Sequence, residues 1–241
     1  MANLVLIHGA WMGAWCWKRV IPFLRNSGHE VYTPTLTGLG ELKHLLRSEI
    51  DLNTHANDIV NFLEYQDIDN VILVAHSYAG MPAGVASHAI PDRLAHLIYV
   101  DAYVPENQKS FFDLQAPRFR DMIQSLADEE GDGWKIPPLA PDGESLGVSN
   151  QDDVEWLRSK MTAHPIRTLE GAAHLENPAA NNIPRTYIFC TGNPPDGTFP
   201  RIANQIKHDE NWNYMELSSP HAAMISSAEA LAGAILRAIK K

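Results

Sequence analysis

A serine between a strand and a helix is the residue of this chain best suited to act as a nucleophile. The apolar run Val71–Val74 leads into Ala75-His76-Ser77-Tyr78-Ala79-Gly80, and a helical pattern follows. A serine on such a sharp turn needs small residues two positions away on each side, because larger side chains would collide there. Alanine fills both places. The segment predicts a nucleophile elbow with Ser77 at its tip, although an ordinary turn that contains a serine gives the same short pattern.

A serine hydroxyl needs a general base, and the chain has eleven histidines. His221 lies between the last expected strand and the last helix, where an imidazole can reach the nucleophile, and it follows the serine along the chain. We expect His76 to point away from Ser77, because adjacent residues around such a turn diverge. Surface or cap positions are expected for His44, His55, His88, His96, His164, His174 and His208. The prediction for the base is therefore His221.

The imidazole in turn needs a carboxylate, and two aspartates after the nucleophile could supply it. Asp101 directly follows the expected strand Leu97–Val100, whereas Asp196 lies several residues into the loop after Thr186–Phe189. A residue at the end of a strand is held more rigidly than one inside a loop. We favour Asp101, with Asp196 open as the alternative and a capping or loop-bracing role also open for Asp101.

The loop after the first expected strand, Leu4–Ile7, can stabilise an oxyanion. It reads His8-Gly9-Ala10-Trp11, and glycine allows the tight turn that such a loop needs. The donors would be the backbone N–H groups of Ala10 and Tyr78. Each such donor contributes about 3–4 kcal/mol of transition-state stabilisation. We expect His8 to brace the loop through a hydrogen bond and to take no part in the chemistry.

The elements that position these residues can be predicted from short apolar runs that alternate with helical patterns. Such alternation is typical of a parallel sheet covered by helices. The expected strands are Leu4–Ile7, Glu30–Thr33, Val71–Val74, Leu97–Val100, Thr186–Phe189 and Trp212–Leu217. The expected helices include Trp15–Arg25, a helix capped by Thr54 that ends near Tyr65, and Ala228–Ile239. The sequence predicts the α/β class, with a mostly parallel sheet of about six strands flanked by helices.

A long segment from about Pro105 to Pro184 interrupts this alternation after the fourth expected strand. It shows no clear strand, and long insertions inside a compact domain are usually functional. We interpret it as a helical cap within a single domain, residues 1–241, a length near the upper limit for one core. Side chains that could line an apolar pocket, or simply pack the cap, are Trp11, Phe111, Phe112, Phe119, Met122 and Trp134.

The formal net charge of −10, from 19 basic and 29 acidic residues, disfavours nucleic acids and anionic membrane surfaces as partners. No apolar stretch approaches the roughly 18 residues of a membrane span, and no secretory signal precedes the first strand. We therefore expect a cytoplasmic protein. The two cysteines, Cys16 and Cys190, are expected to be buried thiols, and no metal-ligand spacing is present.

Several segments together point to one family: His8–Trp11, Pro34–Gly38, Ala75–Gly80 and Pro220–Met224, with Gly38–Glu41, Tyr99–Glu106 and Trp212–Tyr214. They resemble the plant methylesterase and hydroxynitrile lyase branch of the α/β hydrolases, and more closely its bacterial carboxylesterase relatives. The resemblance implies the α/β-hydrolase fold, Ser77 as nucleophile, His221 as base, and Ala10 with Tyr78 as oxyanion donors. The plant pattern has its acid where this chain has Asn193, which cannot carry the charge. The bacterial pattern implies Asp101.

The predicted function is that of a serine carboxylesterase that hydrolyses a small hydrophobic ester or lactone through a Ser-His-Asp triad and an acyl-enzyme. It needs no cofactor, and we expect a small-molecule substrate and a monomer or homodimer. A hydroxynitrile lyase is one alternative, but plant lyases of the resembled family carry a lysine after the catalytic histidine, and this chain has Ala222. A non-catalytic receptor for a small ligand on the same fold is the other alternative.

Overall fold

The computed structural model describes residues 1–139, 143 and 146–240 of the chain. Its main sheet has six strands in the order β2-β1-β3-β4-β7-β8, and each pair of neighbouring strands is parallel. The strands are β1 (Asn3–Ile7), β2 (Glu30–Tyr32), β3 (Val71–His76), β4 (Leu94–Val100), β7 (Arg185–Cys190) and β8 (Asn213–Leu217). All six residues of β3 are buried, as expected for a central strand covered on both faces. The predicted parallel sheet is confirmed.

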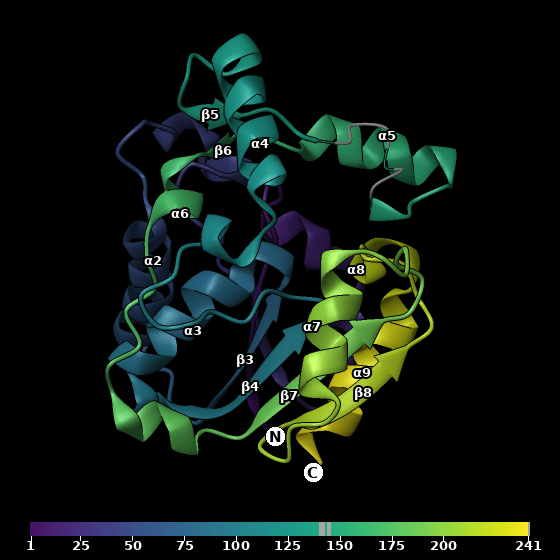
Figure 1. Cartoon of the computed structure of the whole chain (residues 1–241). Coiled ribbons are helices and arrows are strands. Elements are labelled where there is room, and N and C mark those ends of the chain that lie inside the picture. Colours follow the sequence, from purple (N-terminus) through teal and green to yellow (C-terminus); the bar gives the residue numbers. More distant parts are fainter. Residues whose placement is uncertain (140–142, 144–145, 241) are drawn as a thin grey trace.

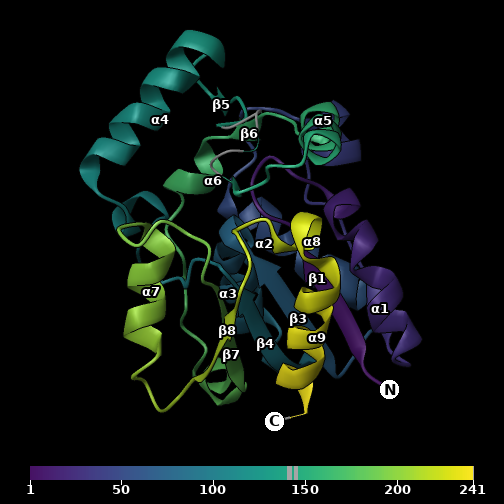
Figure 2. The ribbon, with the colours of Figure 1, turned by 90° about the vertical axis from the view of Figure 1, so that its right-hand side faces the viewer.

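Helices cover both faces of this sheet (Figures 1 and 2). One face carries α1 (Ile21–Asn26), α8 (Ala223–Ser226) and α9 (Ala228–Ile239), and the other carries α2 (Leu52–Tyr65), α3 (Gly80–Ala89) and α7 (Thr198–Ile206). Alternate residues of a strand point to opposite faces, so Leu4 and Leu6 of β1 enter one buried cluster, and Val5 and Ile7 enter the other. The predicted bounds of α9 are confirmed.

The starts of two helices differ from expectation. The expected helix Trp15–Arg25 is divided into the 3₁₀ helix η1 (Ala14–Arg19) and α1, whose first turn contains Pro22, a residue without an N–H to bond to the preceding turn. Helix α2 is capped by Asp51, and the prediction of Thr54 as cap was wrong. Thr54 is the third helical residue of a capping box, in which the Asp51 side chain accepts from the Thr54 N–H at 2.8 Å.

The residues between β4 and β7, which we call the cap segment, first rise over the carboxyl ends of the strands and then return to their amino ends, where β7 begins (Figure 1). Among the described residues, its helices are η5 (Phe112–Leu114), α4 (Pro117–Glu130), α5 (Gln151–Lys160), α6 (Arg167–Glu170) and η7 (Pro178–Asn182). It also contains two strands that the sequence did not predict, β5 (Lys135–Ile136) and β6 (His164–Pro165), which pair antiparallel. Strands of two residues are too short for a periodic pattern to indicate.

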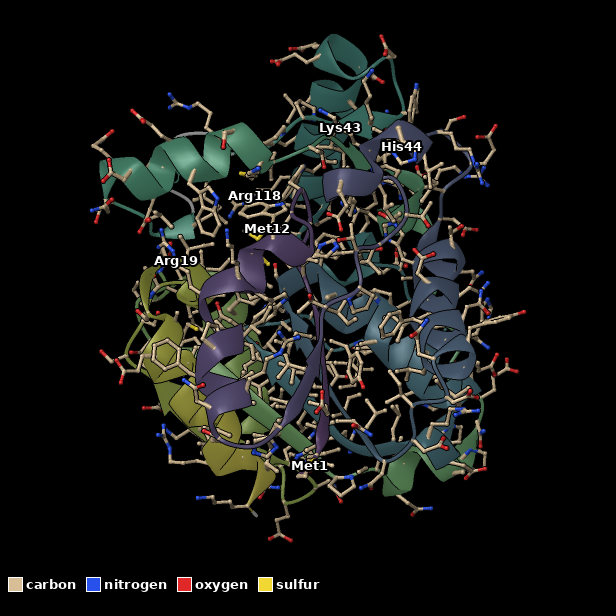
Figure 3. All side chains as sticks on the ribbon, turned by 180° about the vertical axis from the view of Figure 1, so that it is seen from behind. Met1, Met12, Arg19, Lys43, His44 and Arg118 are labelled. Atoms are coloured by element: carbon tan, nitrogen blue, oxygen red, sulfur yellow. The ribbon has the colours of Figure 1, made fainter. Side chains whose placement is uncertain are left out.

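Hydrogen bonds tie the cap segment to the first strand's loop and to η1. The Thr162 N–H donates to the Trp11 carbonyl at 2.9 Å, and the Trp11 indole N–H donates to the Ile136 carbonyl at 3.1 Å. Arg19, labelled in Figure 3, donates to the Asp153 carboxylate of α5 at 2.5 Å. The cap segment is therefore fixed against the loop that contains Ala10. None of the helices described here combines the length and apolar character needed to cross a membrane.

Gly80, at the start of α3, makes the closest approach between the elbow and the chain after β4. A Cβ atom at this position would lie 1.9 Å from the carbonyl oxygen of Tyr103. We expect Gly80→Ala to destabilise the fold by about 3 kcal/mol, because backbone on both sides must move apart. Urea unfolding measures this change.

Gly233→Ala in α9 is the matched control. A Cβ there meets only the far end of the Arg237 side chain, at 3.4 Å. Alanine in a helix interior should leave stability unchanged or raise it by about 0.5–1 kcal/mol. Equal effects of the two substitutions would contradict the close packing assigned to Gly80.

Candidate active site

Ser77 occupies a sharp turn between β3, which ends at His76, and the 3₁₀ helix η3 (Ser77–Ala79) that leads into α3. Its φ of 55° lies in the left-handed region, which residues other than glycine rarely adopt. The loop after β1 packs directly against this turn, because a Cβ on Gly9 would lie 3.0 Å from the Ser77 Cβ. The surrounding backbone thus holds the serine at the carboxyl end of the sheet.

The structure brings Ser77, His221 and Asp101 into one hydrogen-bonded chain. The Ser77 Oγ lies 3.0 Å from the His221 Nε2, and the His221 Nδ1 lies 2.6 Å from the Asp101 Oδ2. The Nδ1–H donates a hydrogen bond to the carboxylate, so the Nε2 lone pair faces the serine hydroxyl. Asp101 is fully buried and His221 nearly so. This arrangement can remove a proton from the Ser77 hydroxyl and return it to a leaving group.

Asp101 is held by groups from the neighbouring strand β7 and from the loop that follows it. The Cys190 N–H donates to the Asp101 Oδ1 at 3.1 Å, and the Asn193 side-chain amide donates to the Asp101 Oδ2 at 2.7 Å. Sequence reasoning noted Asn193 only as a residue without charge and missed that it can support the acid. The available signal was the position of Asn193 just after β7, beside the end of β4.

Asp196, the alternative acid, is exposed and lines a surface groove. The hydrogen bonds of the His221 ring go to Ser77 and Asp101.

His76 braces His221 from the end of β3. Its Nε2 donates to the His221 backbone carbonyl at 3.1 Å, and the two ring centroids are 4.6 Å apart. Burial lowers the pKa of His76 well below its ordinary value, and the nearby His221 lowers it further. His76 therefore stays neutral and fixes the backbone of its neighbour.

His8 fixes the loop that presents Ala10. Its Nε2 accepts from the Leu36 N–H at 3.0 Å, so its Nδ1 carries the proton and donates to the Gly9 carbonyl at 2.9 Å. Burial lowers the pKa of His8 to about 4, which keeps the ring neutral. The structure thus shows the bracing hydrogen bonds that the sequence predicted for His8.

The side chain of Tyr78, the other expected oxyanion donor, is fixed by two buried histidines. The His55 Nε2 donates to the Thr37 carbonyl at 3.0 Å, so its Nδ1 accepts from the Tyr78 hydroxyl at 2.9 Å. The His164 ring, from β6, packs 4.7 Å from the Tyr78 ring. The expectation of a surface or cap position was wrong for His55, which is buried. The available signal was its position on the buried face of α2, one turn before Ile59.

His96 is also buried, in β4, where its Nε2 lies 2.8 Å from the Thr186 hydroxyl. The expectation of a surface or cap position was wrong there too. Strand β4 begins at Leu94, earlier than predicted, and therefore includes this histidine. The hydroxyl on β7 gives the buried imidazole a partner, which explains why the sheet tolerates it.

Aromatic side chains pack around the triad residues. The Phe199 ring of α7 stacks on the His221 ring, with centroids 4.5 Å apart and an interplanar angle of 18°. Tyr103 contacts both Phe199 and Phe111. Of the side chains suggested for an apolar pocket, Phe111 joins this group, whereas Met122 is exposed on α4.

A groove of about 1190 Å³ lies beside the site, between α7 and the chain from Val104 to Phe119. Thr198 and Pro200, the two neighbours of Phe199, are among its lining residues. Ser77 and His221 do not line it, so the groove adjoins the triad and does not contain it.

Comparison with known proteins points to one family. A sequence model of the alpha/beta hydrolase family matches residues 4–234. The carbendazim hydrolyzing esterase of Nocardioides sp. (strain SG-4G) is 32% identical over 241 residues, covering 96% of this chain and 97% of that protein. Methylesterase 9 of Arabidopsis thaliana is 29% identical over 209 residues, covering 79% of each chain.

Solved structures show the same fold. An extracellular alpha/beta-hydrolase from a Paenibacillus species superposes with a TM-score of 0.86 at 22% identity, covering 99% of each chain. A methylesterase from Arabidopsis superposes with a TM-score of 0.79 at 23% identity, covering 100% of this chain and 99% of that one. The α/β-hydrolase fold and the resemblance inferred from the sequence are confirmed.

The buried histidine beside Tyr78 predicts a dependence of stability on pH. Burial lowers the pKa of His55 from 6.5 to about 4 in the folded chain. Its contribution is complete above pH 6.5 and is lost as the pH falls towards about 4, because only the unfolded chain binds the proton. Between about pH 7.5 and pH 5, this loss is about 2 kcal/mol. We expect the His55→Gln variant to lose about that much less stability than wild type over this range, measured by urea unfolding.

His44→Gln is the control, because this histidine is exposed on η2 (Gly40–Leu45; Figure 3). Its variant should keep the wild-type dependence on pH. If the His55→Gln variant also kept it, the neutral state assigned to buried His55 would be wrong.

Proposed function

Because this chain belongs to the α/β-hydrolase family and is a carboxylic ester hydrolase, we propose that it cleaves a small hydrophobic ester or lactone through an acyl-enzyme on Ser77. One observation carries the proposal: the hydrogen-bonded chain from the Ser77 Oγ through both nitrogens of His221 to Asp101. Several curated relatives are named methylesterases, which favours an ester with a small alcohol part. We assign the choice of the acid part to the cap segment.

In the acylation step the Ser77 Oγ attacks the ester carbonyl carbon while the His221 Nε2 takes its proton. The backbone N–H groups of Ala10 and Tyr78 stabilise the negative charge that develops on the carbonyl oxygen. The buried carboxylate of Asp101 stabilises the imidazolium and keeps the ring oriented. The tetrahedral intermediate then collapses, and the leaving alkoxide takes the proton from the His221 Nε2.

In the deacylation step the same groups act on water. The His221 Nε2 removes a proton from a water molecule, whose oxygen attacks the acyl carbon bound to Ser77. The collapse of the second intermediate returns the proton to the Ser77 Oγ and releases the carboxylic acid. Ester and water thus give acid and alcohol, and a lactone gives a hydroxy acid. No further reactant is consumed.

Turnover of a short-chain 4-nitrophenyl ester tests this proposal. Ser77→Ala should reduce kcat by about 10⁴–10⁶-fold, because no other group can form the acyl-enzyme. Ser87→Ala is the control, since it removes a buried hydroxyl in the following helix that donates to the Gly84 carbonyl within that helix. It should keep activity near wild type.

Two results would count against the proposal. Wild-type turnover by the Ser77→Ala variant would exclude this serine as the nucleophile. Binding of the ester by wild-type protein without any turnover would instead favour a receptor built on the same fold.

A further inference from the structure

We propose that Phe199 is a positioning residue that stabilises the protonated form of His221 through the face of its ring. The inference deepens the proposed function and rests on it, because the imidazolium forms when His221 takes the proton of Ser77. The two rings are nearly parallel, at 18°, with centroids 4.5 Å apart. Such stacking places the π face of Phe199 against the imidazole, where the positive charge develops.

The position of Phe199 relative to the nucleophile is fixed by Tyr103. The Tyr103 ring meets the Phe199 ring at 5.1 Å between centroids and an angle of 64°, an edge-to-face geometry that aromatic pairs prefer. Tyr103 is buried, and its backbone N–H donates to the Ser77 carbonyl at 3.1 Å. Phe199 also lies in the first turn of α7, which begins at Thr198. The stack is therefore built into the same rigid unit as the elbow.

The face of a benzene ring is negative, and it attracts a cation whose centre lies within about 6 Å. Among the residues that the structure describes, the titratable and polar groups that contact the His221 ring from other elements are the Asp101 carboxylate at the end of β4, the Ser77 hydroxyl, and His76 at the end of β3. His76 is neutral, because burial lowers its pKa well below the ordinary value. Asp101 supplies a full negative charge beside the imidazolium. The face of the Phe199 ring, stacked on the His221 ring, is the second group that attracts the positive charge.

The direction of the effect follows from this arrangement. Removing the aromatic face destabilises the imidazolium relative to the neutral imidazole, so the pKa of His221 should fall. The acidic limb of the rate profile then moves to lower pH. At the same time the plateau rate falls, because the transition state requires the imidazolium. A residue that only fills space would not shift the acidic limb.

The direct test is an NMR titration of the His221 imidazole in the free protein, with the signal assigned by its loss in His221→Gln. Phe199→Leu should lower the His221 pKa by about 0.5–1 unit. Phe199→Trp should restore it to wild type or above, because tryptophan binds cations best. Phe111→Leu is the matched control: it removes a ring of the same aromatic group that contacts Tyr103, and it should leave the His221 pKa unchanged.

The second readout is the rate of fluorophosphonate labelling of Ser77 as a function of pH. Phe199→Leu should move the acidic limb in the same direction and reduce the plateau rate by about 3–10-fold. A His221 titration in Phe199→Leu that matches wild type would overturn the inference, as would an equal shift in Phe111→Leu. Because the NMR titration needs no substrate, failure of the proposed esterase activity would be seen separately, as absent turnover in a protein whose His221 still titrates.

Discussion

The hydrogen bond between Asp101 and His221 is the contact on which the rest of the site depends. A carboxylate that is fully buried must have partners, and this one accepts from the His221 Nδ1, the Cys190 N–H and the Asn193 amide. The same bond selects the imidazole tautomer that turns its lone pair to Ser77. It can form only because β3, β4, β7 and β8 lie side by side and in parallel, so that their carboxyl ends bring the four contributing turns together.

The backbone is strained at several of the turns that follow the strands of the main sheet. Trp11, Ser77 and Asp101 all have positive φ values, of 63°, 55° and 44°, directly after or close to the ends of β1, β3 and β4. Such conformations cost of order 1–3 kcal/mol each and persist only where packing enforces them. Two glycines allow this close packing, because they have no side chain: Gly9 lies against Ser77, and Gly80 lies against Tyr103. The buried sheet therefore stabilises a site that would not form in isolation.

Much of this arrangement could be predicted because its signals are local. The apolar runs gave the six strands of the main sheet, and the small residues around Ser77 indicated the elbow. Sequence reasoning singled out Ser77, His221 and Asp101, which the structure brings together. The start of α2 was missed although its signal is also local: Asp51 and Thr54 form one cap, and neither residue's type decides which of them starts the helix.

The missed residues around the site depend on contacts between segments that are distant in the sequence. Asn193 and Phe199 lie in or beyond a loop rich in proline and glycine, and their roles come from Asp101 and His221, which are far away in the sequence. His55 is buried because Tyr78 and Thr37 give its two nitrogens partners. Residue type alone does not distinguish a buried histidine of this kind from one on the surface. Only its position on the buried face of the helix indicates that it is buried.

The most direct test of the account is the rate at which a fluorophosphonate labels Ser77 in Asp101→Asn and in Asp196→Asn, with the adduct located by mass spectrometry. Both substitutions replace a carboxylate with an amide of the same shape. We expect Ser77 to be labelled about 10⁴-fold more slowly in Asp101→Asn than in wild type, because the amide does not favour the required tautomer of His221, and at the wild-type rate in Asp196→Asn. Wild-type labelling of Asp101→Asn, or loss of labelling in Asp196→Asn alone, would contradict it.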